Sequence, residues 1–134
     1  MSGAKTVVIV DDDSDTRFLI SRSLRNDDRI QIVAEVPDAR SAVDAIRSLR
    51  PDVVVLDHYI NGSVMGLDSA PVIKTISPDT KVIVFTETDL GLEAYLEPEI
   101  DAYLRKDELP RLLSLIQRVL GLEEQSYAPQ PGSK

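Results

Sequence analysis

The stretch TVVIVDDDSDTR, residues 6–17, decides the fold. Valine and isoleucine fill positions 7–10 without a polar break, which predicts a strand buried on both of its faces. Three aspartates come directly after this run, and the residues that follow place Phe18, Leu19 and Leu24 on one side of a helix. A buried strand that passes into an amphipathic helix is typical of the first unit of an α/β protein.

The same alternation of strand and helix continues along the chain. Apolar runs predict four more strands, at residues 30–36, 53–56, 81–85 and 102–104. Helical spacing and proline positions predict helices at residues 16–25 and 39–49, from 67 to just before 78, in a short segment that ends near 98, and at 110–120. Connections of this length force right-handed crossovers, so the chain is predicted to form a parallel five-stranded sheet with helices on both faces.

Length and composition are those of an ordinary soluble protein. With 134 residues, 43% hydrophobic and 28% charged, the chain has the size and mixture of one globular domain. It lacks both the roughly 20 apolar residues of a membrane helix and the apolar core of a signal peptide, so a cytoplasmic protein without membrane contact is expected. A net charge of −8 disfavours direct binding to nucleic acid. Cysteine is absent, so the chemistry must rest on oxygen and nitrogen.

The chain is expected to contain one domain and a tail. Residues 1–121 hold all the predicted strands and helices. Residues 122–134 contain two prolines and a glycine and show no periodicity, which is typical of a flexible tail or a linker.

Polar side chains stand where four predicted strands end: Asp11, Asp12 and Asp13 after the first, Asp57 after the third, Thr86 on the fourth and Lys106 after the fifth. Since the carboxyl ends of parallel strands share one edge of the sheet, these groups are expected to meet there. Carboxylates at short range raise one another's pKa unless a cation neutralises them, and Mg²⁺ or Mn²⁺ suits such oxygen ligands. Part of the acidic run, Asp13 or Ser14 and Asp15, could serve only to cap the first helix.

A lysine and a threonine beside a carboxylate cluster indicate phosphoryl chemistry. A metal ion, an ammonium group and a hydroxyl around one carboxylate together stabilise the oxygens of a phosphoryl group during its transfer. The carboxylate can then act as the nucleophile and become an aspartyl phosphate.

Four segments in order carry a resemblance to a known family: VVIVDDDSDTR, VVVLDHY, VIVFTE and AYLRKDE. Together they resemble the receiver domain of two-component response regulators, and the resemblance covers about Lys5 to Leu120. It implies a doubly wound, flavodoxin-like sheet in the strand order 2-1-3-4-5 with five helices. It also implies that the chain is either a stand-alone regulator or the receiver part of a longer protein.

The resemblance assigns a phospho-acceptor and a metal site. Asp57 would accept the phosphoryl group and contribute to a site for Mg²⁺ or Mn²⁺. Asp12 would bind the metal directly, Asp11 would act through a water, and Tyr59 would contribute its backbone carbonyl.

The resemblance also assigns a switch. Thr86 would form a hydrogen bond with the phosphoryl group, and Lys106 would pair with it. Tyr103, three residues before that lysine, matches the aromatic residue that swings inward when the threonine moves.

The implied function is a phosphorylation-controlled signalling switch and not an enzyme, since such a domain catalyses only its own phosphorylation and dephosphorylation. The phosphoryl donor would be a sensor histidine kinase, a phosphotransfer protein or a small acyl phosphate. The output would be a changed surface on the fourth helix, the fifth strand and the fifth helix. A downstream protein would recognise this surface, or a second copy of the chain in a phosphorylation-dependent homodimer.

The surroundings of the site depart from the family pattern. Glu87 stands after Thr86 where the family has a small residue, which makes it a candidate modulator of phosphorylation. His58, a second candidate, lies beside Asp57, but adjacent strand residues face opposite sides, so it is expected to point away. The loop after the acceptor lacks the usual Met-Pro, and the short interval before Lys106 predicts a shortened fourth helix.

Two alternative functions stay open at this point. The altered loop would suit a receiver-shaped scaffold that signals without phosphorylation, although the retained charged residues argue against it. Asp11-x-Asp13, followed by Thr86 and Lys106, also resembles the early motifs of haloacid-dehalogenase-like phosphatases. No acidic pair follows Lys106 in the right context for that family, and 134 residues leave no room for its cap domain.

Overall fold

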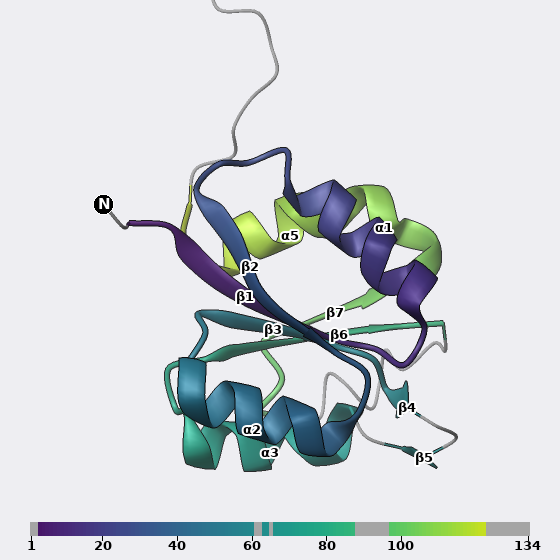
Figure 1. The fold of residues 1–134 in the computed structure, drawn as a ribbon, viewed down its shortest axis with the longest axis vertical. Helices are drawn as coiled ribbons and strands as arrows, with labels where there is room; N and C mark the ends of the chain where they lie inside the picture. Colours follow the sequence, from purple (N-terminus) through teal and green to yellow (C-terminus); the bar gives the residue numbers. More distant parts are fainter. Residues whose placement is uncertain (1–2, 61–62, 65, 88–96, 123–134) are drawn as a thin grey trace, which may run out of the picture.

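A sheet of five parallel strands forms the centre of the molecule, in the order β2-β1-β3-β6-β7 (Figure 1). The strands are β1 (Lys5–Val10), β2 (Ile30–Val36), β3 (Val53–Leu56), β6 (Lys81–Thr86) and β7 (Ala102–Arg105). The computed structural model describes residues 3–60, 63–64, 66–87 and 97–122. The fold prediction is confirmed, since this is the 2-1-3-4-5 order once the two short strands of a separate hairpin are set aside.

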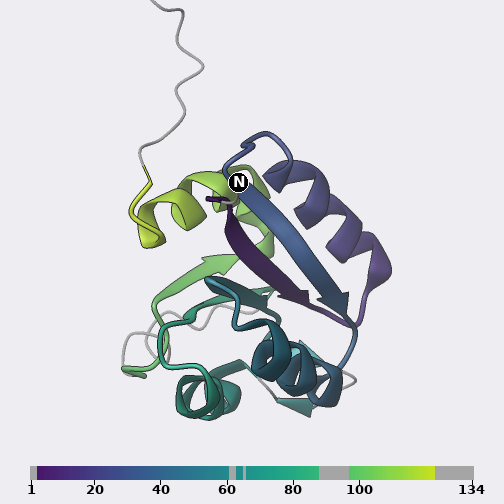
Figure 2. The same ribbon diagram turned by 60° about the vertical axis from the view of Figure 1, so that its left-hand side comes forward.

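Helices cover both faces of this sheet (Figures 1 and 2). One face carries α1 (Ser14–Leu24) and α5 (Leu112–Val119), and the other carries α2 (Ala39–Leu49) and α3 (Gly66–Ile76). The predicted short fourth helix falls mainly on residues 88–96, which lie outside the described part of the chain. No helix among the described residues combines the length and the apolar character that crossing a membrane requires.

Each face of the sheet has its own apolar core, because successive residues of a strand point to opposite sides. In β1, Val7 and Ile9 belong to the core under α1 and α5, whereas Val8 and Val10 belong to the core under α2 and α3. All four side chains are at most 1% exposed. Burial on both faces explains why these strands are unbroken runs of valine and isoleucine.

The helix after the acidic run begins at Ser14, two residues earlier than predicted, because Asp13 caps it. The Asp13 carboxylate accepts hydrogen bonds from the Thr16 hydroxyl at 2.8 Å and from the Asp15 backbone N–H at 3.1 Å. These two donors lower the pKa of Asp13. Both oxygens of this carboxylate therefore serve the start of α1, which confirms the helix-capping interpretation.

Two further features differ from the prediction. A short antiparallel hairpin, β4 (Tyr59–Ile60) and β5 (Ser63–Val64), lies in the region that was expected to be a loop. Its signal in the sequence is the Asn-Gly pair between the two strands, which two-residue hairpin connections favour. The last helix is preceded by a 3₁₀ segment, η1 (Lys106–Arg111), so α5 begins at Leu112 and not at Pro110.

The buried carboxylate of Asp27 ties the loop before β2 to α5 through a hydrogen bond from Gln117. The Asp27 carboxylate is 1% exposed and accepts hydrogen bonds from Arg29 Nη2 at 2.8 Å and from Gln117 Nε2 at 2.8 Å. Arg29 and, to a smaller extent, Gln117 hold the pKa of Asp27 far below its usual range, although burial acts in the opposite direction. The bond from Gln117 links two segments that are 90 residues apart in the sequence.

Replacing Asp27 with asparagine is expected to lower the free energy of unfolding by about 2 kcal/mol at neutral pH, because it removes the charged acceptor of both bonds. The folded pKa of Asp27 lies below its unfolded value of about 4, so this contribution is present above that value and is lost as the pH falls below it. Urea unfolding at several pH values measures the effect. The control is Asp28→Asn at the exposed neighbour, and equal losses in both variants would contradict the assignment.

Candidate metal and phosphoryl site

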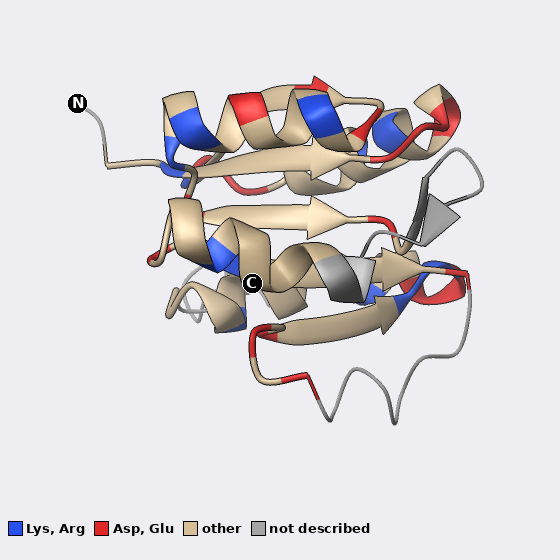
Figure 3. Ribbon diagram, turned by 90° about the horizontal axis from the view of Figure 1, so that it is seen from below, with Lys and Arg blue, Asp and Glu red and all other residues tan. Residues whose placement is uncertain are grey.

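Three charged side chains stand directly after strands at one edge of the sheet. Asp11 follows β1, Asp57 follows β3 and Lys106 follows β7. Each continues the row of strand residues that faces the core under α1 and α5, a row that contains Ile9, Val55 and Leu104. Acidic segments at the tips of strand arrows mark this edge in Figure 3. The parallel sheet thus brings together residues that are far apart in the sequence.

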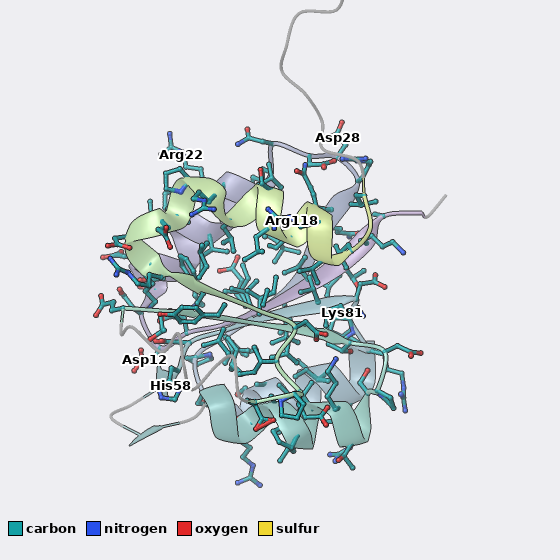
Figure 4. The ribbon with its side chains drawn as sticks, turned by 180° about the vertical axis from the view of Figure 1, so that it is seen from behind. Asp12, Arg22, Asp28, His58, Lys81 and Arg118 are labelled. Atoms are coloured by element: carbon teal, nitrogen blue, oxygen red, sulfur yellow. The ribbon has the colours of Figure 1, made fainter. Side chains whose placement is uncertain are left out.

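The carboxylates of Asp11, Asp12 and Asp57 form a compact cluster, with ligand oxygens within 4.8 Å of one another. Asp11 and Asp57 are 1% and 7% exposed, whereas Asp12 lies at the surface (Figure 4). Three like charges at this range repel one another, and burial strengthens the repulsion. The cluster therefore needs positive charge beside it.

Lys106 supplies one such charge. Its Nζ lies 2.8 Å from Asp11 Oδ2 and 3.2 Å from Asp57 Oδ2, and 16% of its side chain is exposed. Burial lowers the pKa of Lys106, but the hydrogen bonds and charges of Asp11 and Asp57 together outweigh burial and raise the pKa above its usual value. The ammonium group is therefore charged at neutral pH and joins the ends of β1, β3 and β7.

The donor set of the cluster suits a hard divalent cation, because Mg²⁺ binds oxygen ligands and keeps several of its waters. Both oxygens of Asp11 already accept hydrogen bonds, Oδ1 from the Asp13 backbone N–H at 2.9 Å and Oδ2 from Lys106. This arrangement suits a role for Asp11 through a water. Tyr59 is the first residue of β4, two residues beyond Asp57, and its carbonyl stays a predicted ligand.

The two predicted switch residues lie on the neighbouring strands. Thr86 is 1% exposed and is the last residue of β6, which lies between β3 and β7 in the sheet. Tyr103 is half-buried in β7 and lines a groove of about 720 Å³ between β7 and α5. Their functions in phosphoryl binding and switching stay predictions.

The two candidate modulators differ in their exposure. Glu87 is exposed directly after β6. His58 is 4% exposed, and strand alternation places it with Leu56 on the side of the sheet that α2 and α3 cover, opposite to Asp57. Figure 4 shows His58 on this side. The placement suits a packed neighbour of the acceptor, and an effect on phosphorylation stays a prediction for both residues.

Sequence reasoning missed Arg17, which contacts the site from α1. Its Nη1 donates a hydrogen bond to the backbone carbonyl oxygen of Asp11 at 2.5 Å, and its Nε lies 3.9 Å from Glu35 Oε1 on β2. The sequence does contain a signal, because helix side chains lean toward the N-terminus. A long arginine side chain in the first turn can therefore reach back to the strand end that precedes the helix.

The family model of the response regulator receiver domain matches residues 7–117, which is more than half of the chain. The matched residues include the whole carboxylate cluster and Lys106. The chain therefore belongs to the response regulator receiver domain family, as its motifs suggested.

Curated relatives include two kinds of protein. A protein-glutamate methylesterase/protein-glutamine glutaminase of Rhizobium etli is 38% identical over 104 residues, which are 77% of this chain and 30% of that protein. The nitrate/nitrite response regulator protein NarP of Escherichia coli is 31% identical over 109 residues, which are 80% of this chain and 50% of that protein. The chain thus spans half or less of the length of these relatives.

Solved structures share the fold over most of the chain. The signal receiver domain of NarL from Mycobacterium tuberculosis has a TM-score of 0.78 at 22% identity and covers 88% of this chain and 97% of that one. The response regulator domain of CheB from Thermotoga maritima has a TM-score of 0.76 at 18% identity and covers 90% of this chain and 99% of that one. Identities this low establish the common architecture alone.

Proposed function

We propose that this chain is a phosphorylation-controlled signalling switch in which Asp57 accepts a phosphoryl group in the presence of Mg²⁺ or Mn²⁺. The observation that carries the proposal is the contact of Lys106 with the carboxylates of both Asp11 and Asp57. An ammonium group and a cation site around one buried carboxylate can neutralise the charge of an incoming phosphoryl group. Membership of the receiver family supports the same chemistry.

In the proposed reaction, an oxygen of Asp57 attacks phosphorus and forms the O–P bond of an aspartyl phosphate. The bond from phosphorus to the nitrogen of a phosphohistidine, or to the oxygen of a small acyl phosphate, breaks, and its electron pair leaves with the donor. Lys106 neutralises the phosphoryl oxygens, and Thr86 donates a hydrogen bond to one of them. A bound Mg²⁺ supplies further charge neutralisation, and the residues that would hold it are Asp11, Asp12, Asp57 and Tyr59 through its carbonyl.

Phosphorylation would act as a switch because the phosphoryl group gains its contacts with Thr86 and Lys106 in one arrangement of the surrounding loops. Moving an equilibrium from 1:99 to 99:1 takes about 5.5 kcal/mol. Charge-assisted hydrogen bonds contribute about 1.5–3 kcal/mol each, so two or three are enough. Tyr103 is proposed to carry the change to the surface of β7 and α5, whose groove it lines.

The proposed setting is a cytoplasmic two-component pathway. A sensor histidine kinase or a phosphotransfer protein would supply the phosphoryl group, and residues 1–121 would form the receiver, with 122–134 as a tail or linker. A downstream protein or a second copy of the chain would bind the face that includes β7 and α5. Because the chain carries a net charge of −8, this partner is proposed to be a protein and not a nucleic acid.

The two alternatives fit the site less well. A haloacid-dehalogenase-like phosphatase would need Asp13 as an acidic group beside a nucleophilic Asp11. The Asp13 carboxylate instead caps α1, and both oxygens of Asp11 accept hydrogen bonds from protein groups. A scaffold that signals without phosphorylation would have no need of the buried contact between Lys106 and Asp57.

Intact mass spectrometry after incubation with acetyl phosphate and Mg²⁺ tests the proposal. The expected result is the gain of one phosphoryl group, which disappears when a chelator is added and is released by hydroxylamine, as an acyl phosphate is. Absence of any gain, in a protein that binds Mg²⁺ by calorimetry, would favour the scaffold function. Catalytic turnover of a small phosphate ester would favour the phosphatase.

A further inference from the structure

The peptide group between Asp11 and Asp12 sets the directions in which these two carboxylates leave the backbone. The N–H of Asp11 donates a hydrogen bond to the Val36 carbonyl oxygen on β2 at 3.1 Å. The carbonyl oxygen of Asp11 accepts the 2.5 Å hydrogen bond from Arg17 Nη1. Asp11 is therefore anchored to β2 through its N–H and to α1 through its carbonyl.

Arg17 is itself held in place. Only 19% of its side chain is exposed, and its Nε lies 3.9 Å from Oε1 of Glu35. Glu35 directly precedes Val36, whose carbonyl binds the Asp11 N–H. Its backbone N–H donates to the carbonyl oxygen of Asp13, the residue that caps α1. The Arg17 side chain thus reaches from the first turn of α1 to the backbone carbonyl of Asp11 and lies near the end of β2.

We propose that Arg17 is a positioning residue of the metal site, acting through the backbone carbonyl of Asp11. By fixing the peptide group that follows Asp11, it orders the carboxylates of Asp11 and Asp12 next to Asp57 before a divalent cation binds. The inference rests on the proposed Mg²⁺-dependent function of this cluster. The negative charge of Glu35, whose Oε1 lies 3.9 Å from Arg17 Nε, attracts the guanidinium group toward this end of β2.

Arg17 has two effects on a cation at this site, and they are of opposite sign. Its positive charge repels the cation, so loss of the charge alone would tighten Mg²⁺ binding. Its hydrogen bond orders the ligands in advance, so loss of the bond would weaken Mg²⁺ binding. Because the bond is short and the side chain is largely buried, the ordering effect is the larger one. If loss of Arg17 weakens Mg²⁺ binding, the ordering effect is the larger one; if it tightens Mg²⁺ binding, the charge repulsion is the larger one.

The test is the Mg²⁺ affinity of Arg17→Met, measured by isothermal titration calorimetry. We expect a dissociation constant about tenfold higher than that of wild type, which is the usual effect of losing an outer-shell hydrogen bond. Arg17→Lys, which keeps the charge and one donor, is expected to recover part of the affinity. With acetyl phosphate, the Mg²⁺ concentration for half-maximal phosphorylation should rise by the same factor, while the rate at saturating Mg²⁺ stays within about twofold.

The matched control is Arg22→Met, which removes the same charge from an exposed position of α1 (Figure 4). Its Mg²⁺ affinity is expected to equal that of wild type. Circular dichroism without Mg²⁺ establishes that each variant is folded. If Arg17→Met does not fold, Glu35→Gln is the substitute, with a smaller loss of affinity expected.

Three results would overturn the inference. If wild type binds Mg²⁺ and Arg17→Met binds it as tightly or more tightly, Arg17 has no positioning function, and the proposed function of the cluster stands. The same conclusion follows if Arg17→Met is unfolded and Glu35→Gln and Arg17→Lys both keep the wild-type affinity. If wild type binds no Mg²⁺, the proposed function fails together with the inference.

Discussion

Asp57→Asn is expected to abolish phosphoryl uptake from acetyl phosphate completely. The amide has nearly the shape of the carboxylate, so the strand end and its contact with Lys106 can persist, but a neutral amide oxygen is not a nucleophile for phosphorus. Removing one of three clustered charges also weakens Mg²⁺ binding, because the cation loses a charged ligand. Intact mass spectrometry and calorimetry measure the two effects separately.

Asp13→Asn is the matched control for this variant, since it makes the same change beside the cluster. Asparagine caps helices about as well as aspartate, so α1 and phosphoryl uptake should both be retained. A gain of one phosphoryl group in Asp57→Asn, located on Asp11 by peptide mapping, would show that the acceptor is misassigned. Loss of uptake in both variants would instead point to a general effect of charge.

Lys106→Met is expected to slow phosphoryl uptake by at least about a hundredfold, which is the usual effect of removing one charged donor from a site where negative charge develops. It also leaves the buried carboxylates of Asp11 and Asp57 without their ammonium partner, so the free energy of unfolding at neutral pH should fall by about 3 kcal/mol. Added Mg²⁺ should stabilise this variant more than wild type, because the cation then replaces the missing charge. The rate of uptake is measured by intact mass spectrometry of samples quenched at successive times, and the stability by thermal unfolding.

The free energy of unfolding of wild type should fall at high pH as Lys106 loses its proton. The folded pKa of Lys106 is raised above its ordinary value, so its contribution is fully present below about pH 10 and is lost as the pH rises through the folded pKa. Lys106→Met should lack this loss, whereas Lys81→Met, at an exposed lysine of β6, should keep it. Equal pH profiles for the two variants would contradict the assignment.

The sheet could be predicted from the sequence because its strands are buried on both faces. Val7 to Val10 form an unbroken apolar run, and such runs have few other structural explanations in an α/β chain. The β4–β5 hairpin was missed because two-residue strands are too short to show a period. The start of α1 was placed two residues late because it was taken from the spacing of the apolar residues, which begin only at Phe18, although Asp13 was considered as a cap.

Only the part of the candidate site that stands directly after strands could be predicted from the sequence. The parallel sheet brings Asp11, Asp57 and Lys106 to one edge, and the motifs alone indicate this. That Lys106 contacts Asp11 as well as Asp57 depends on the register of β7, which a sequence pattern does not fix. Arg17 was missed for a related reason, because its contact is with a backbone carbonyl and not with another motif residue.

The position of β7 at the outer edge of the sheet has a consequence for the newly made protein. Synthesis proceeds from the N-terminus, so β1, β2 and β3 can pair while the last strand is still being made. A chain on the ribosome therefore carries Asp57, the proposed acceptor, before it carries Lys106, which lies 49 residues further on. The cluster of Asp11, Asp57 and Lys106 is complete only when the outermost strand joins the sheet. Under the proposed function, the chain would therefore become able to accept a phosphoryl group only when its fold is finished.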